Sequence, residues 1–423
     1  MFRPPIALLF LAAGFLSCER QNSPNSLSMA QSAAPTASAS ASKLPTFSAN
    51  IPRIATTSGD IALHNLEAQM ARLEVRIARL SESKDKSAEL LENSVELIEL
   101  LLIRAEFLGR IADMERALLL AEEACAQSPK QAGAFYARAK ARSALHRFSD
   151  ALLDLDRAEK LGFRTDSIGS KRASIWAAQG RYDDALPLLS KAALEQPSIH
   201  SLGALAALLG EMGRHDEASH LFGEALSLYR DSSPFPVAWI FFQQGLLEER
   251  LQKPSLAHAY FEAAVQKLPL YAHAASHLAT YLPHEPALEQ LRRIVERSDD
   301  PEHRAQLSEL LGRMGRKVEA GEQLEQAKAR FVQITERYPE AFADHGARFF
   351  LYRANDAQKA LQLARLGAAN RNTEAVLDLW LSAAIAANAQ KEACEAALKA
   401  QGLAHGSRIF QEMSLKVREQ CEP

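Results

Sequence analysis

The sequence predicts an all-α protein, built as an α-α superhelical solenoid of about nine helix pairs. Apolar residues recur at spacings of three and four from about residue 59 to residue 417, and no strand-like alternation longer than a few residues interrupts them. Alanine recurs at one place in successive segments, and the separations between these alanines centre on 34 residues. Glycine and proline, 19 and 18 in 423 residues, are used less than average, which favours helix over strand.

Charge and cysteine content exclude two classes of protein. The formal net charge is -3, and no run of five or more lysines and arginines occurs, so the chain has no basic stretch to neutralise a phosphate backbone. We therefore expect no nucleic-acid partner. Four cysteines in a chain of this length cannot form a disulfide-dependent scaffold.

The first element, residues 1–17, has the pattern of a secretory signal peptide. Arg3 precedes an apolar run from Ile6 to Leu16. Eleven residues span only about 16 Å as a helix, roughly half of a bilayer core, so the run is too short for a transmembrane helix.

The end of this signal resembles the lipobox of bacterial lipoproteins, in the order Phe15, Leu16, Ser17 and Cys18. The resemblance implies that Cys18 becomes the first residue of the mature chain and carries acyl chains such as palmitate. The alternative is an ordinary cleaved signal beside a chance cysteine. Glu19 stands where inner-membrane lipoproteins often have Asp, which favours the outer membrane, facing the periplasm.

Residues 18–58 are predicted to be a disordered tether behind the lipidated cysteine. They repeat Ser, Ala, Asn, Gln and Pro and contain few residues that a core could bury. A flexible segment of about 35 residues has an r.m.s. span of about 30 to 35 Å, enough to hold a folded body clear of a lipid surface.

Residues 98–404 contain the repeats. The recurring alanines are separated by 34, 34, 33, 39, 30, 33, 40 and 33 residues, in the order Ala117, Ala151, Ala185, Ala218, Ala257, Ala287, Ala320, Ala360 and Ala393. Each stands early in the second helix of a pair. Small residues at such positions let the helix backbones approach closely.

This pattern resembles tetratricopeptide repeats. That family has a small residue in helix A, a small residue early in helix B, a large apolar residue four positions later, another small residue three positions after that, and a terminal proline. The third repeat shows the pattern with Ala173, Ala185, Leu189, Ala192 and Pro197. The resemblance implies a scaffold that binds protein segments, with residues 59–97 and 405–423 as N- and C-terminal caps.

The sequence gives no support for catalysis and implies no cofactor. It lacks G-x-S-x-G, H-E-x-x-H, a phosphate-binding glycine loop and C-x-x-C. Two cysteines, Cys394 and Cys421, bracket the last helix B and the C-terminal segment. A disulfide between them would staple that cap in an oxidising periplasm, and two unpaired thiols are the alternative.

In tetratricopeptide arrays the ligand normally lies along helix A on the concave side. The register places these residues there: Tyr136, Lys140, Lys171, His200, Trp239, Phe242, Gln243, Leu246, His273, His277, Phe349 and Tyr352. Trp239, Phe242 and Leu246 would then stand in water, which implies a hydrophobic or helical peptide as ligand. The alternative is that Pro234 and Pro236 shift the register and bury these side chains.

Two histidines on one helix face raise a second hypothesis. His273 and His277 are four residues apart, a spacing that can place two imidazoles on one metal ion, with His200 or His258 as a third ligand. Surface histidines in a peptide groove are the alternative.

The sequence thus predicts a lipid-anchored envelope scaffold without catalysis, whose partners are envelope proteins or peptide segments and whose only membrane attachment is the N-terminal lipid. Two other hypotheses remain open, a metal- or small-ligand-binding envelope protein and a regulatory subunit of an envelope hydrolase.

Overall fold

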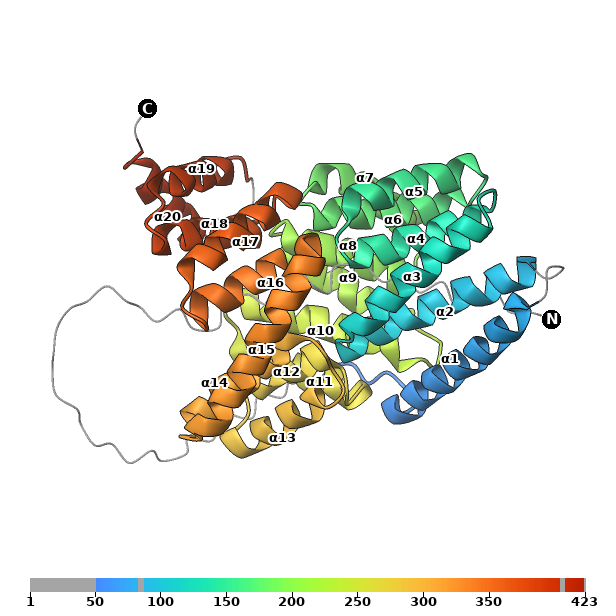
Figure 1. Cartoon of the computed structure of the whole chain (residues 1–423), viewed down its shortest axis with the longest axis horizontal. Helices are drawn as coiled ribbons and strands as arrows, with labels where there is room; N and C mark the ends of the chain where they lie inside the picture. The colour runs from blue at the N-terminus through green and yellow to red at the C-terminus, as the bar shows by residue number, and fades with distance from the viewer. Residues whose placement is uncertain (1–50, 83–86, 404–407, 422–423) are drawn as a thin grey trace.

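The computed structural model describes residues 51–82, 87–403 and 408–421, and within these ranges every regular element is a helix. The signal peptide, Cys18 and most of the predicted tether lie outside the described residues. Helices α2 to α19 form nine consecutive antiparallel pairs within the described part of the chain (Figure 1). None of the described helices is both long enough and apolar enough to cross a membrane.

The first helix of each pair, helix A, lines the inner side of the array, and the second, helix B, covers the outer side. The A helices are α2 (Ser87–Leu108), α4 (Ala132–Ala144), α6 (Thr165–Ala178), α8 (Ile199–Glu211), α10 (Pro234–Arg250), α12 (Ala272–Ala279), α14 (Pro301–Arg313), α16 (Pro339–Tyr352) and α18 (Glu374–Ala386). The B helices are α3 (Ile111–Gln127), α5 (Phe148–Lys160), α7 (Tyr182–Glu195), α9 (His215–Ser227), α11 (Pro254–Lys267), α13 (His284–Val295), α15 (Lys317–Arg337), α17 (Ala357–Asn370) and α19 (Gln390–Ala400).

The recurring alanines hold the pairs together. Ala151, Ala185, Ala218 and Ala257 are completely buried, as expected for positions where two helix backbones approach closely. Gly245 shows the same requirement in α10, since a Cβ atom there would lie 2.4 Å from the ring of Phe261. The structure confirms the predicted all-α solenoid.

The turns between helix A and helix B share one conformation. The residue two positions before each helix B is left-handed in eight of the nine described pairs, namely Gly109, His146, Gly180, Gly213, Gln252, Gly315, Asn355 and Asn388. In five pairs an arginine follows this residue and forms an ion pair with the acid three positions on, as Arg181 does with Asp184 at 2.8 Å. The conformation of this turn therefore recurs from repeat to repeat, as the buried alanines do.

Two helices lie at the ends of the array. At one end α1 (Gly59–Ser81) packs on α2, and at the other α20 (Arg408–Arg418) packs on α19. Helix α2 runs without a break through residues 97 and 98, where the sequence placed the boundary between the N-terminal cap and the repeats. Because α2 pairs with α3, it is the helix A of the first repeat, and α1 alone forms the cap.

The array curls until its early and late repeats touch. Helix α12 contacts α2, α1 contacts α10, and Phe107 of α2 packs on Phe235 and Tyr271, with ring centroids 5.0 and 4.7 Å away. The extended segment before α1 joins this contact, because Thr57 donates its backbone N–H to Ser232 at 2.7 Å. The solenoid therefore closes into a compact body (Figure 1) instead of leaving an open superhelical groove.

Candidate functional site: the inner face of the helix array

Helix α10 lies at the centre of the closed body, and nearly all of its residues are buried. Trp239, Phe242 and Leu246 are among them, so the structure corrects the expectation that they stand in an open groove. Pro234 begins a longer helix A in this repeat, and the closing array covers every side of it. The alternative of burial is the one that the structure shows.

The cover of α10 comes from neighbouring repeats. Trp239 lies over Gly203 of α8, where an added Cβ would stand 3.1 Å from the indole ring. Phe242 packs against Phe261 and Tyr271, with ring centroids 5.9 and 5.1 Å away. These side chains contribute to the core and offer no apolar surface to a partner.

The two predicted metal ligands, His273 and His277, are buried on α12, and both rings lie beside Phe242. Burial lowers the pKa of His273 to about 3, and its ring lies 5.5 Å from that of His303. His277 places its Nδ1 atom 3.1 Å from Glu249 of α10. No group of three or more potential metal ligands comes together within the described residues, so nothing in this region favours the metal hypothesis.

A charged network lies next to these histidines and was not predicted from the sequence. His345 of α16 places Nδ1 3.0 Å from Glu302, and Arg371 forms an ion pair with Asp344 at 2.6 Å. Burial alone would lower the pKa of His345, but Glu302 and Asp344 raise it to about 10. The network links α14, α16 and the turn before α18, so it positions late repeats against each other.

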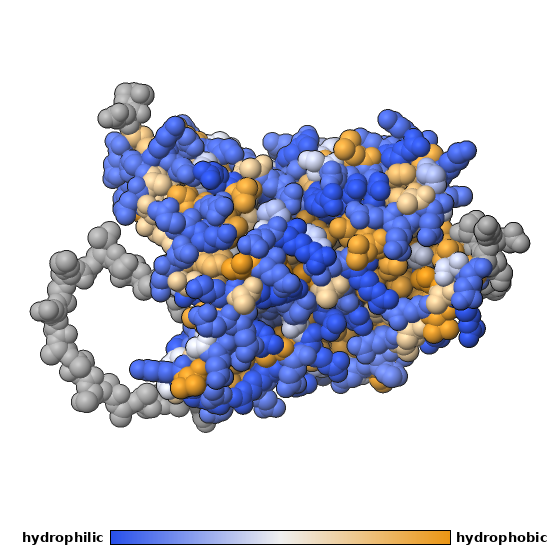
Figure 2. Space-filling model, viewed as in Figure 1, coloured by the Kyte–Doolittle hydropathy of each residue, from blue (hydrophilic) through white to orange (hydrophobic). Residues whose placement is uncertain are grey.

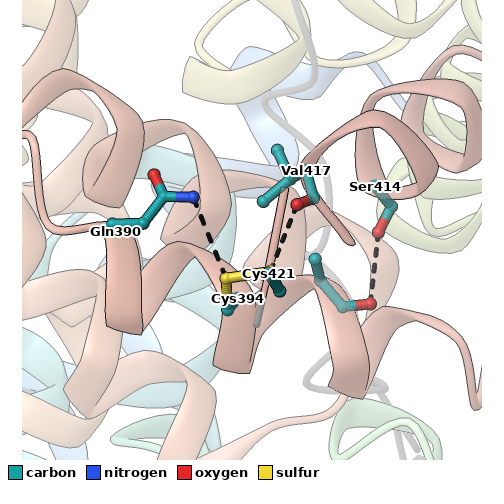
Figure 3. Close-up of a disulfide and its surroundings, with 6 residues drawn as sticks. Gln390, Cys394, Ser414, Val417 and Cys421 are labelled. Atoms are coloured by element: carbon teal, nitrogen blue, oxygen red, sulfur yellow. Dashed lines mark hydrogen bonds between the residues drawn. A yellow bond between two sulfur atoms is a disulfide. The ribbon is translucent and has the colours of Figure 1, made fainter. Parts of the chain in front are cut away.

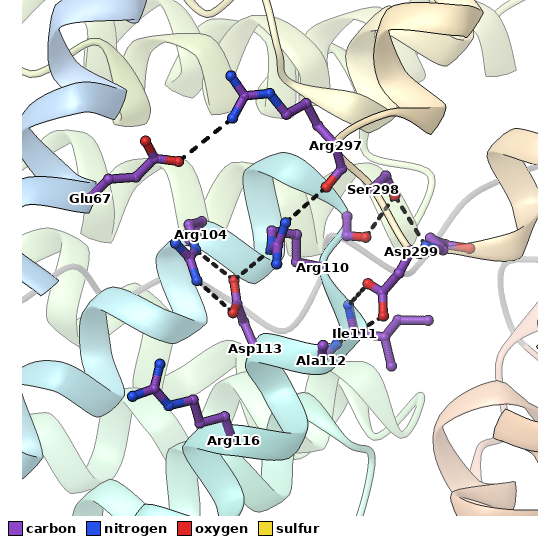
Figure 4. Close-up of polar contacts among 12 residues, drawn as sticks. Glu67, Arg104, Arg110, Ile111, Ala112, Asp113, Arg116, Arg297, Ser298 and Asp299 are labelled. Atoms are coloured by element: carbon purple, nitrogen blue, oxygen red, sulfur yellow. Dashed lines mark hydrogen bonds and ion pairs between the residues drawn. The ribbon is translucent and has the colours of Figure 1, made fainter. Parts of the chain in front are cut away.

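Ring closure has two polar seams, and the first joins the turn before α3 to the turn before α14 (Figure 4). Asp299 accepts hydrogen bonds from the backbone N–H groups of Ile111 at 2.6 Å and Ala112 at 3.2 Å. Ser298 donates to the carbonyl of Gly109 at 2.6 Å. Asp299 thereby caps a helix 187 residues away in sequence, where the orphan N–H groups of the first turn need acceptors.

The second seam joins the turn between α17 and α18 to the turn between α6 and α7. Asn372 donates its backbone N–H to Gln179 at 2.9 Å, and Arg371 donates its Nε–H to Ala178 at 3.0 Å. A Cβ atom on Gly180 would lie 2.3 Å from the carbonyl oxygen of Asn372. The contact is therefore backbone against backbone, which leaves no room for a side chain at Gly180.

Four of the remaining predicted groove residues lie on α8, α10 and α16. Gln243, on α10, is partly buried, and Phe349, on α16, is completely buried. Tyr352, at the end of α16, is 47 % exposed. His200 of α8 is partly buried, and burial lowers its pKa to about 4. These four residues are spread over three A helices.

Helices α4 and α6 bring the other three predicted residues together. Tyr136 donates its hydroxyl to the carbonyl of Ser167 at 3.5 Å, and Lys140 forms an ion pair with Glu99 of α2 at 2.8 Å. The side chains of Lys140 and Glu99 are 17 % and 24 % exposed, so this part of the inner face stays partly open. Lys171 of α6 is only 5 % exposed.

Lys171 has no partner of opposite charge among the residues that the structure describes. The structure gives its ammonium group neither a hydrogen bond nor an ion pair with any described residue. Burial and the neighbouring charge of Lys140 lower the pKa of Lys171 to about 7. This arrangement differs from the other buried cations described above, because Arg371 has a carboxylate beside it.

The C-terminal cap contains a disulfide between Cys394 and Cys421, with Cα atoms 5.9 Å apart (Figure 3). It joins α19 to the end of α20, where Ser414 also donates to the carbonyl of Ala397 at 3.3 Å. Cys125, by contrast, is a buried free thiol.

The outer surface shows no large apolar face in the view of Figure 2. Hydrophobic residues appear between hydrophilic ones, and most of the visible surface is hydrophilic. Among the described residues, the three most exposed large apolar side chains are those of Leu153 in α5, Leu194 in α7 and Val318 in α15, which belong to B helices in different repeats.

Comparison with known proteins yields partial structural matches. No protein-family model matches the sequence, and no curated protein matches it. The structure aligns with pilF of Pseudomonas aeruginosa at 18 % identity over 49 % of this chain and 92 % of that one, with a TM-score of 0.35. It also aligns with YrrB, described as a TPR protein with an unusual peptide-binding site, at 18 % identity over 48 % of this chain and 97 % of that one, with a TM-score of 0.28.

Within the described region the chain is a helical solenoid whose architecture resembles that of tetratricopeptide repeats. The resemblance rests on the chain's own features, which are the nine helix pairs of the described region, the buried alanines and the repeated left-handed turn.

Proposed function

We propose that the chain is a lipid-anchored scaffold of the bacterial cell envelope that binds other proteins and performs no catalysis of its own. One combination of features supports this proposal most strongly, namely a tetratricopeptide-type array that follows the lipobox-like sequence ending at Cys18. Repeat arrays of this type have interaction as their usual role.

The disulfide supports the compartment. A bond between Cys394 and Cys421 persists in an oxidising environment such as the periplasm and is uncommon in cytosolic proteins. With Glu19 after the cysteine, we place the anchor in the outer membrane, facing the periplasm.

The sealed half of the array takes no part in partner binding under this proposal. Trp239 and Phe242 are core residues, and the partner segment binds on the part of the inner face that α4 and α6 form, where Lys140 stays partly exposed. This replaces the hydrophobic peptide that an open groove would have implied.

Two measurements test the proposal. Growth with an alkyne-labelled palmitate should label the wild-type chain and the Cys125→Ala control, while Cys18→Ala should lose the label and leave the membrane fraction. An unlabelled wild-type chain would contradict the anchor.

The scaffold role is tested by quantitative mass spectrometry on the tagged chain purified from cross-linked membranes. A defined set of envelope proteins should co-purify, and a reciprocal purification on each should recover this chain. If no protein is enriched above a Cys18-anchored control without the array, the scaffold role is wrong.

A further inference from the structure

We propose that Lys171 is the centre of a binding site for a single carboxylate group, supplied by an acidic side chain of the partner segment. The inference rests on the proposed scaffold function, because it names the chemistry of the partner that the inner face would recognise.

The first observation is the environment of Lys171. Lys171 is only 5 % exposed, and the structure pairs it with no described carboxylate. A buried charge without a partner costs several kcal/mol, so a protein rarely keeps one without a use for it. The ammonium group needs an acceptor, and the described residues supply none.

The second observation comes from Ser174, one helical turn further along α6. Its hydroxyl is buried and has no hydrogen-bond partner. Residues three apart on a helix lie on the same face, so the Ser174 hydroxyl and the Lys171 ammonium face the same side of α6. A carboxylate, with two oxygens, can accept one hydrogen bond from each.

Local charge decides which anion fits. Lys140 is already neutralised by Glu99 at 2.8 Å, so Lys171, Lys140 and Glu99 together leave one uncompensated positive charge. A single carboxylate balances it, whereas a phosphate dianion would add a second negative charge close to Glu99. The count therefore favours an aspartate or glutamate side chain over phosphate.

A partner segment can reach Lys171 from the partly exposed surface next to it. Lys140 and Glu99 are partly exposed and lie on α4 and α2, the two A helices before α6. A peptide segment that runs along these helices reaches Lys171 with one side chain while its backbone stays at the rim.

The test measures binding of a fluorescent tetraglutamate peptide to the full chain by anisotropy, with a tetraglutamine peptide as the uncharged counterpart. Lys171→Met keeps the length of the side chain and removes the charge, and we expect it to weaken tetraglutamate binding about tenfold, as for loss of one charge-assisted hydrogen bond. Lys191→Met, on the exposed face of α7, should leave binding unchanged.

Ser174→Ala is the second variant and should weaken binding about threefold through loss of a neutral hydrogen bond. The site is refuted if Lys171→Met binds as wild type does, or if tetraglutamine binds as tightly as tetraglutamate. Displacement of the peptide by equimolar inorganic phosphate would likewise refute the assignment to a carboxylate.

The two proposals fail separately. If Lys171→Met leaves peptide binding unchanged while envelope proteins still co-purify with the chain, only the carboxylate site is wrong. If no protein co-purifies, the scaffold role is wrong whatever the peptide result.

Discussion

Helices α6 and α10 are both the helix A of their repeats, yet their inner faces differ in what packs against them. The inner face of α10 carries Trp239, Phe242 and Leu246 and is covered by neighbouring repeats until it becomes core. The inner face of α6 carries Lys171 and Ser174, which are buried without a polar partner in the described part of the chain. The apolar face of α10 is packed against other parts of the protein, whereas the polar groups of Lys171 and Ser174 on α6 meet no polar partner among the described residues.

The difference shows that repeat register predicts which side of a helix faces inward, but not what lies opposite. Part of the cover of α10 depends on ring closure, since Phe107 of α2 meets Phe235 of α10 only when the first repeat folds back on the fifth. A solenoid that closes in this way converts part of its binding groove into hydrophobic core.

Truncation of Phe242 should have the largest effect on the free energy of unfolding. Phe242→Ala should lower the free energy of unfolding by about 3 to 5 kcal/mol, because the side chain is 2 % exposed and removing it leaves a cavity. Leu194→Ala, at a side chain that is 84 % exposed, should change it by less than about 0.5 kcal/mol. Chemical denaturation followed by circular dichroism measures both. Equal effects would mean that α10 is not core.

Loss of the disulfide should act on the C-terminal cap alone. Cys421→Ser opens a link between residues 27 apart, worth about 3 kcal/mol in loop-closure entropy. Because repeats contact mainly their neighbours, faster proteolysis should be confined to α19 and α20. Unchanged proteolysis of α20 would show that the cap does not depend on the bond, and a cut within α10 would contradict its independence from the cap.

The second seam is tested by two glycines with the same backbone conformation. Gly180 and Gly213 have φ of 79° and 76°, so alanine at either position costs about 1 to 2 kcal/mol. Gly180→Ala should cost about 1 to 3 kcal/mol more, because its Cβ would meet the carbonyl of Asn372, whereas nothing lies within 4 Å at Gly213. Thermal melts of the two variants supply the comparison. Equal melting temperatures would indicate that the seam is open in solution.

Lys171 should make stability depend on pH in the window between about 7 and 10.5. Its pKa is about 7 in the folded chain and near the ordinary 10.5 when unfolded, so between these values the unfolded state binds more protons. Stability therefore rises with pH from about 7 to 10.5, by up to about 1.4 kcal/mol per pH unit, and this contribution is absent below pH 7. Lys171→Met should remove that slope, measured by urea denaturation across the range. A slope that persists in the variant would mean that another group causes it.

The sequence was sufficient for the features that local contacts determine. Ala151 and Ala185 are buried as the 34-residue period requires, because each packs within its own helix pair. The seams follow no such pattern, since Asp299 and Ile111 meet across 188 residues. No local spacing could have shown that Trp239 is covered, and only the longer interval before Ala257 hinted at a departure in that repeat.

The charged residues show the same difference between local contacts and contacts that depend on the whole fold. Lys171 was placed on the inner face by register alone, but its lack of a partner depends on every helix packed around α6. The ion pair between Arg181 and Asp184 and its four equivalents, by contrast, follow a local pattern, an arginine three residues before an acid, after five of the eight left-handed turns.

Hydrogen exchange at two helix N-termini reports whether the ring is closed in solution. The first-turn amides of Ile111 and Ala112 in α3 are bound by Asp299 across the seam, whereas those of His215 and Asp216 in α9 have no acceptor among the described residues. We predict slow exchange at Ile111 and Ala112 and fast exchange at His215 and Asp216. Fast exchange at all four would show that the ring is open and that the inner face of α10 is accessible after all.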